Sequence, residues 1–284
     1  MSNNEEQLNH IAEILMINGT LLPDPGLING QLGIVIFFFY YARYTGESLY
    51  EEYAYTLIDE IQKQIHANSP ASYAKGIAGI GVGIDYLIQK GFLEAGEDTY
   101  DDPDQRMFRA VMYEPCSDFS FYFGLSGYGR YWMKRLQQFS SANQASTCLK
   151  RIVERMKEKL PDMPVGIQPD VYCFLYDLSR QSGFEFCHSL LEKCSVWDLR
   201  SVNNNLRFPR LGDTSVSNYA RVCLQGYYFD PIEMDRIKVD LNQLPDLNME
   251  ESSVDPGILS GYAGEGLLRL TMLNHSDLSW MFLL

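Results

Sequence analysis

Gly30-Gln31-Leu32-Gly33 is the first of six short glycine-marked turns, and each turn is followed by a helix-like apolar run. The other five turns are Gly76-Ile77-Ala78-Gly79, Gly124-Leu125-Ser126-Gly127, Gly166-Ile167-Gln168-Pro169, Gly212-Asp213-Thr214-Ser215 and Gly261-Tyr262-Ala263-Gly264. The first glycines of successive turns are 42 to 49 residues apart. A repeat of this length is typical of ring and solenoid architectures, so the period predicts the fold class before any single helix is considered.

The apolar runs after the turns predict six inner helices. Residues 34–43 are apolar or aromatic at almost every position, and residues 80–89 carry Ile80, Val82, Ile84 and Leu87. A helix that is apolar on most sides is buried on most sides. The corresponding runs of the later repeats are residues 128–136, 171–178, 216–224 and 266–273.

Amphipathic segments between these runs predict an outer layer of helices. In residues 49–66, the apolar side chains of Tyr53, Leu57, Ile61 and Ile65 recur every four positions. Similar patterns occupy residues 5–17, 146–160 and 184–194. We therefore predict an all-α fold, an α/α toroid formed as a double-layered ring of about six helical hairpins, in one domain over residues 1–284. Residues 94–104 and 240–256 are expected to be solvated connections.

The composition narrows the class of protein. With 37 acidic and 23 basic residues, the net charge is −14, which disfavours nucleic acid and anionic membrane surfaces as partners. No apolar run reaches the roughly 18 residues that a bilayer span needs. The polar N-terminal residues lack the basic and apolar regions of a secretory signal. Because the six cysteines form no CxxC pair, we expect them to be reduced in a cytoplasmic protein.

Residues around four of the turns resemble the repeat of the lanthionine synthetase C-like (LanC-like) family. The first copy is Gly26-Leu27-Ile28-Asn29-Gly30-Gln31-Leu32-Gly33-Ile34, followed by an aromatic-rich run and Tyr44-Thr45-Gly46. The second, third and sixth turns are further copies. The fourth and fifth turns keep the spacing but have Pro169 and Ser215 in place of the second glycine. The resemblance extends over nearly the whole chain and implies an α/α toroid of nested helical layers.

The resemblance also implies a zinc site. Cyclases of this family bind zinc through two cysteines and one histidine, and the metal activates a peptide thiol that adds to a dehydroalanine or dehydrobutyrine. A coordinated thiol is deprotonated, which explains the need for metal. In the family the ligands precede the glycine turns of late repeats, as Cys-x-Gly and Cys-His-Gly. The corresponding pairs here are Pro164-Val165, Arg210-Leu211 and Leu259-Ser260. These pairs cannot bind zinc, so we expect no metal and no cofactor.

Three other groups of residues are candidate sites. Cys187-His188 lies in an outer-helix pattern, and we interpret it as structural because adjacent helical residues diverge by about 100°. Asp101-Asp102-Pro103-Asp104 is similar to the DDxxD motif of terpene cyclases, but we interpret it as a solvated acidic turn. Asp170 and Asp213 follow the fourth and fifth turns and could form an acid–base pair. Aspartate at a helix start is an ordinary stabiliser, so we favour capping for both.

The glycine turns should lie at the N-termini of the inner helices, all on one rim of the ring. We predict that this rim binds a peptide through Asn29, Gln31, Lys75, Ser126, Gln168, Asp170, Arg210, Asp213, Ser260 and Glu265. The apolar tail Met281-Phe282-Leu283-Leu284 is expected to pack on the first hairpin and close the ring.

The favoured functional hypothesis is a non-catalytic or zinc-independent LanC-like component of the maturation of a ribosomally synthesised, lanthipeptide-like peptide. Its partners would be a ribosomally made precursor peptide, a peptide-modifying enzyme, or both. Two alternatives stay open. One is a thioether cyclase with a displaced zinc site, and the other is a carbohydrate-active α/α barrel that uses Asp170 and Asp213.

Overall fold

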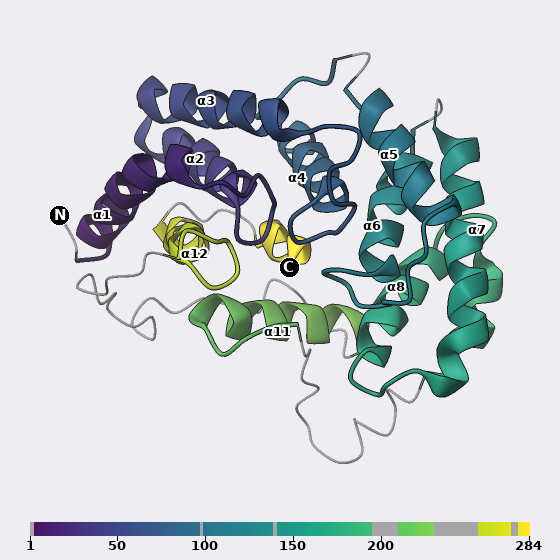
Figure 1. The fold of residues 1–284 in the computed structure, drawn as a ribbon. Helices are drawn as coiled ribbons and strands as arrows, with labels where there is room; N and C mark the ends of the chain where they lie inside the picture. Colours follow the sequence, from purple (N-terminus) through teal and green to yellow (C-terminus); the bar gives the residue numbers. More distant parts are fainter. Residues whose placement is uncertain (1–2, 97–98, 139–140, 195–209, 230–254, 274–277) are drawn as a thin grey trace.

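Six inner helices follow the six glycine-marked turns and stand side by side in a ring (Figure 1). They are α2 (Gln31–Thr45), α4 (Ile77–Gln89), α6 (Leu125–Leu136), α8 (Gln168–Ser179), α11 (Ser215–Tyr228) and α12 (Tyr262–Leu273). Neighbouring helices pack on each other, Tyr228 of α11 donates to Asp177 of α8 over 2.7 Å, and α12 packs on α2, so the ring is closed. This computed structural model describes residues 3–96, 99–138, 141–194, 210–229, 255–273 and 278–284, and no strand occurs among them.

The inner helices are buried on nearly all sides, as their sequences predict. In α2 every residue from Gln31 to Tyr41 is buried, including three consecutive phenylalanines, Phe37, Phe38 and Phe39. Burial of one such side chain contributes about 1.5–3 kcal/mol relative to exposure. The apolar runs after the turns therefore supply the common core of the ring.

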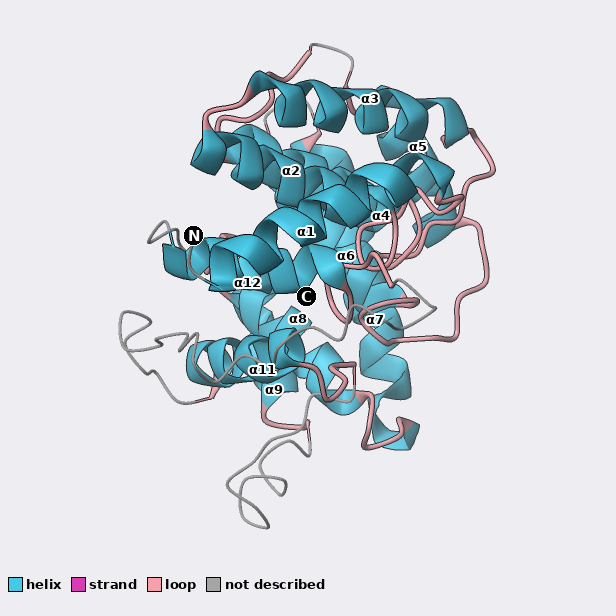
Figure 2. Ribbon diagram, turned by 90° about the vertical axis from the view of Figure 1, so that its left-hand side faces the viewer, coloured by secondary structure: helices cyan, strands magenta, loops and turns pink. Residues whose placement is uncertain are grey.

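An outer layer of amphipathic helices covers the ring of inner helices. Its members are α1 (Asn3–Asn18), α3 (Ser48–Gln64), α5 (Asp101–Met112), α7 (Ala142–Lys159) and the single turn α9 (His188–Leu191). Short 3-10 helices occupy Gly19–Leu21, Leu160–Asp162, Glu185–Cys187 and Ser279–Leu283. Figure 2 shows α3 over the outer side of α2. Residues 184–194 are predicted to form one outer helix. The structure has two short helices there instead, the 3-10 helix Glu185–Cys187 and α9.

Within the described residues, no helix combines the length and the apolar character that crossing a bilayer requires.

The first turn of α5 corrects one prediction. Residues 94–104 are predicted to be a solvated connection, but α5 begins at Asp101, and Asp104 is only 8% exposed. The Asp104 carboxylate accepts from the Tyr131 hydroxyl at 2.6 Å and pairs with Arg135 at 2.8 Å. The prediction was wrong because carboxylates favour the first turn of a helix, and because a distant arginine compensates the buried charge. Residues 240–254 of the other predicted connection lie outside the described residues.

Four of the six turns share one geometry. In turns one, two, three and six, the residue after the first glycine donates its N–H to the main-chain oxygen seven residues earlier, over 2.8 to 2.9 Å. The loop thus folds back onto the helix N-terminus. A Cβ on Gly76 would overlap the carbonyl oxygen of Pro70, so only glycine fits there.

Turns four and five are built differently. No atom lies within 4 Å of a Cβ placed on Gly166. Helix α11 is capped by Thr214, whose hydroxyl accepts from the Ser217 N–H at 3.1 Å. These are the two turns that depart from the family pattern in sequence, so the substitutions at Pro169 and Ser215 accompany a real change of backbone geometry.

The last residues of the sequence fill the centre of the ring. The 3-10 helix Ser279–Leu283 lies there (yellow in Figure 1), and Trp280, Met281, Leu283 and Leu284 are buried. The prediction that this tail packs on the first hairpin was wrong. The ring closes through α12, which packs on both α1 and α2, and the space enclosed by six inner helices is filled by the apolar tail.

Candidate functional site

Hydrogen bonds join the glycine turns into one rim around the mouth of the ring. Main-chain bonds of 2.8 to 3.2 Å run from turn six to turn one, from turn one to turn two, and from turn two to turn three. Their donor and acceptor pairs are Ile258 to Ile28, Ile28 to Ala74, and Ala74 to Tyr122. Turn five joins turn six through the Thr214 hydroxyl, which donates to the main-chain oxygen of Leu259 at 3.0 Å. The turns therefore lie on one side of the ring, as the repeat predicts.

A buried ion pair connects turns three, four and five. Arg210 donates to Asp170 at 2.6 Å, and the second carboxylate oxygen of Asp170 accepts from the Phe121 N–H at 2.9 Å. The Arg210 guanidinium also lies 4.4 Å over the Phe121 ring. Burial alone would lower the pKa of Arg210, but the adjacent Asp170 carboxylate raises it above its usual value. The arginine therefore stays charged although it is enclosed.

The same arginine holds the end of the tail. The main-chain oxygen of Leu284 accepts from Arg210 Nε at 3.0 Å and from the Tyr122 hydroxyl at 3.3 Å. The main-chain oxygen of Leu283 accepts from the Tyr73 hydroxyl at 3.0 Å. Burial raises the pKa of Tyr73 to about 12, so its hydroxyl remains a donor at neutral pH. Tyr122 and Arg210 both stand two positions before the glycine of their turns.

A second ion pair lies deeper in the centre. Arg130 pairs with Asp177 at 2.7 Å, and the Tyr228 hydroxyl donates to the same carboxylate oxygen at 2.7 Å. The adjacent thiol of Cys173 is buried, which raises its pKa above the usual value and keeps it protonated. The cavity beside these groups has a volume of only about 20 Å³. That is room for about one water molecule.

The residues at the expected ligand positions do not fit a zinc ion. A guanidinium has donors and no acceptor, and Arg210 is already paired with Asp170. Leu211 and Leu259 are buried hydrocarbons, and the Ser260 hydroxyl bonds to Asp255 at 2.7 Å. Across the part of the chain that the structure describes, no three His, Cys, Asp or Glu side chains gather in a way that could hold a metal.

The adjacent Cys187 and His188 face different surroundings. Cys187 is fully buried and His188 is exposed at the start of α9. The six cysteines are free thiols. This pair therefore agrees with its structural interpretation.

Four of the predicted rim residues lie on the first turn of an inner helix and bond to their own surroundings. Gln31 donates to the Gly19 oxygen, Ser126 to the Phe119 oxygen and Gln168 to the Met163 oxygen, over 2.6 to 3.2 Å. Glu265 is buried against Arg269 at 2.8 Å. The first three tie helices to preceding segments, Glu265 pairs within α12, and all four are buried.

The remaining predicted rim residues divide into exposed and enclosed ones. Asn29, Lys75, Asp213 and Ser260 are exposed, whereas Asp170 is buried in its pair with Arg210. Two further rim residues, Phe123 and Val165, are not among the predicted ones and are each 54% exposed. Their position directly before a glycine, which they share with Asn29, Lys75 and Ser260, could have identified them.

Asp170 and Asp213 do not form the acid–base pair of a carbohydrate-active enzyme. Both oxygens of Asp170 are engaged, and the Asp213 side chain is 92% exposed and 3.8 Å from Arg221. Neither aspartate caps its helix through its side chain, because Thr214 caps α11 and Asp170 accepts from turn three, but Asp170 does lie in the first turn of α8.

Comparison with known proteins agrees with the internal repeat. The family model described as "Lanthionine synthetase C-like protein" matches residues 23–174, more than half of the chain and the first four turns. No curated protein and no solved structure matches the chain significantly.

Proposed function

The chain belongs to the lanthionine synthetase C-like family, and from this premise we propose that it is a non-catalytic, zinc-independent component of ribosomally synthesised, lanthipeptide-like peptide maturation. It binds the precursor peptide, alone or together with a peptide-modifying enzyme, across the rim of glycine turns. The observation that carries the proposal is the filling of the ring centre by the chain's own last residues, held by Arg210 at a position where the family resemblance places a metal ligand.

The exposed rim supports peptide binding. The residues directly before the glycine are exposed at five of the six turns, and Leu211 of turn five is buried. They present an amide, an ammonium group, an aromatic ring, an aliphatic side chain and a hydroxyl, from Asn29, Lys75, Phe123, Val165 and Ser260. Such a mixture suits a peptide, whose recognition combines apolar anchors with hydrogen bonds to the main chain.

Binding of a synthetic precursor peptide, taken from a short reading frame beside the gene, tests the proposal. We expect micromolar affinity for the wild-type chain. Phe123→Ala should weaken the affinity at least fivefold, because removal of an interface aromatic costs about 1 kcal/mol or more. Phe186→Ala is a matched control, since Phe186 is 51% exposed on the outer 3-10 helix.

Two outcomes would contradict the proposal. One is the absence of any binding at micromolar concentration. The other is thioether formation by protein that contains stoichiometric zinc, which would establish the alternative of a cyclase with a displaced metal site.

A further inference from the structure

A branched cleft opens between the outer helices α3 and α5, over the inner helix α4. Three adjacent cavities form it, with volumes of about 110, 270 and 420 Å³, and Ile65 lines all three. We call them the apolar branch, the basic branch and the rim branch. The rim branch reaches Lys75 and Gly76 of the second turn, so the cleft is continuous with the rim.

The apolar branch has the size and lining of a side-chain pocket. Its volume is about 110 Å³, and it is lined by isoleucines of α3 and α4, namely Ile58, Ile61, Ile77, Ile80 and Ile84. Tyr100 and Pro103 complete it from the start of α5. An apolar cavity of roughly 150 Å³ holds benzene, so this branch suits one branched aliphatic side chain.

The Tyr100 hydroxyl lacks a partner at this pocket. Tyr100 is 7% exposed, its ring lies 4.1 Å beneath the Arg135 guanidinium, and its hydroxyl makes no hydrogen bond within the described residues. Buried hydroxyls are almost always hydrogen-bonded, so an acceptor from beyond the described residues is expected here. Burial raises the pKa of Tyr100, which keeps the hydroxyl a donor at neutral pH.

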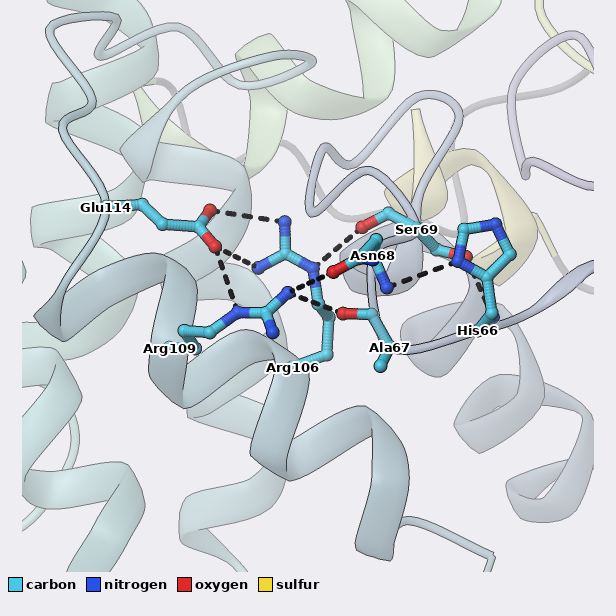
Figure 3. Close-up of polar contacts among 7 residues, drawn as sticks. All are labelled: His66, Ala67, Asn68, Ser69, Arg106, Arg109 and Glu114. Carbon is cyan, nitrogen blue, oxygen red and sulfur yellow. Dashed lines mark hydrogen bonds and ion pairs between the residues drawn. The ribbon is translucent and has the colours of Figure 1, made fainter.

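The basic branch offers a second unused donor (Figure 3). Arg106 is fully engaged, with Nε on the Ser69 oxygen at 2.7 Å and both terminal nitrogens on Glu114. Arg109 donates Nε to Glu114 at 3.1 Å and Nη2 to the Ala67 oxygen and to Asn68, so Nη1 has no partner among the described residues.

The basic branch is less acidic than the rest of the chain. Two arginines neutralise Glu114, His66 lies beside them, and Asp102 alone among the lining residues is acidic. The chain as a whole carries a net charge of −14, so most of its surface repels acidic groups. Arg106 and Arg109 offset Glu114 and Asp102, so this branch is less acidic than the surface as a whole, and Nη1 of Arg109 is the donor that it offers to an acidic group.

We propose that the cleft binds an extended segment of an acidic peptide. An aliphatic side chain of the peptide enters the apolar branch, and an oxygen of the peptide accepts a hydrogen bond from the Tyr100 hydroxyl. A neighbouring carboxylate of the peptide pairs with Arg109. This inference rests on the proposed function in taking the ligand to be a peptide. It adds a binding site outside the mouth, and the rim branch lets one peptide occupy both.

Fluorescence anisotropy with the labelled heptapeptide Gly-Ser-Ile-Glu-Glu-Ser-Gly and the full chain tests the proposal. We expect saturable binding that is lost when the probe has serine for isoleucine or lysine for both glutamates. Tyr100→Phe should weaken the affinity about 2- to 10-fold, and Arg109→Glu more than about tenfold. The matched controls are Tyr113→Phe on the exposed end of α5 and Arg151→Glu on α7, whose side chain is 44% exposed against 42% for Arg109. Both controls should bind the probe as the wild-type chain does.

Failure of this proposal can be told apart from failure of the proposed function. No binding of the probe at millimolar concentration, or binding that does not depend on the isoleucine, overturns the cleft site. If the natural precursor peptide binds equally to the wild type, Tyr100→Phe and Arg109→Glu, the cleft site is also refuted, while peptide binding at the rim stands. If the probe binds with the expected variant pattern but no precursor peptide binds, the cleft is supported and the proposed function fails.

Discussion

Replacement of Arg210 by methionine tests the interpretation of the ring centre most directly. The guanidinium pairs with Asp170 at 2.6 Å, donates to the main-chain oxygen of Leu284 at 3.0 Å and lies over the Phe121 ring. The side chains of the pair are 5% and 6% exposed, so solvent does not screen the interaction. The methionine variant leaves the Asp170 carboxylate enclosed with the Phe121 N–H as its remaining donor.

The expected loss follows from these contacts. Removal of one partner from a buried ion pair costs about 3–5 kcal/mol, because the other charge is left uncompensated. The lost hydrogen bond to Leu284 adds about 1 kcal/mol. We therefore expect the free energy of unfolding of Arg210→Met to fall by about 4–6 kcal/mol. In the double variant, Asp170→Asn removes the second charge and keeps an amide oxygen for the Phe121 N–H, so the loss should be only about 1–2 kcal/mol.

Urea unfolding followed by the fluorescence of the buried tryptophans measures these differences. Arg151→Met is the control, because its ion pair with Glu154 is largely exposed and should contribute no more than about 1 kcal/mol. A loss below about 1 kcal/mol for Arg210→Met would refute the reasoning. So would a double variant no more stable than the single one, since the cost would then not come from a stranded charge.

Four other predictions concern the frame, the tail, ionisation and metal. Gly76→Ala should lower stability by about 2–3 kcal/mol or prevent folding, whereas Gly166→Ala should stay within about 0.5 kcal/mol in thermal unfolding; equal effects would contradict the difference between the turns. Trp280→Ala should lower the free energy of unfolding by about 3–5 kcal/mol and increase the binding of a hydrophobic dye. Unchanged stability would show that the tail is not part of the core. Burial raises the pKa of Tyr73 from 10.0 to about 12, so its stabilisation is complete below pH 10 and disappears as the pH rises to about 12. Between pH 10 and about pH 12, the free energy of unfolding of Tyr73→Phe should fall by about 2–3 kcal/mol less than that of the wild type. Equal pH dependence of unfolding in the two proteins would contradict this. Protein from zinc-replete growth should hold far less than one zinc per chain by elemental analysis.

The sequence predicted those parts of the structure that depend on local pattern. The six inner helices begin within a few residues of the glycine turns, since burial on all sides leaves an apolar signal at every position of a run such as Phe37 to Phe39. The sequence also marked turns four and five as different, because each lacks the second glycine.

The parts that the sequence did not predict depend on partners far along the chain. Asp104 is buried because Arg135 reaches it, and Asp170 pairs with an arginine 40 residues later, so neither carboxylate differs locally from a solvated one. The place of the tail also depends on tertiary packing. The apolar composition of a segment predicts that it is buried, but it does not predict which helices it packs against. Six of the ten predicted rim residues are enclosed by partners that the local pattern does not reveal: Gln31, Ser126, Gln168 and Glu265 bond within their own surroundings, and Asp170 and Arg210 pair with each other.

Two kinds of hydrogen bond hold the rim together. The turns that are joined by side chains are the two whose sequences depart from the family pattern. Turns six, one, two and three form an arc joined by main-chain hydrogen bonds, which require the close backbone approach that glycine permits. Turns four and five lack that geometry and are joined to their neighbours by side chains, through Asp170, Arg210 and Thr214. In this half of the ring the charged side chain of Arg210 links neighbouring turns. Arg210 stands two positions before the glycine of its turn, and a guanidinium that donates to Asp170 cannot serve as a metal ligand. Arg210 thus joins its turn to Asp170 at a position where the family resemblance implies a metal ligand, so Arg210→Cys should break this ion pair and weaken the rim.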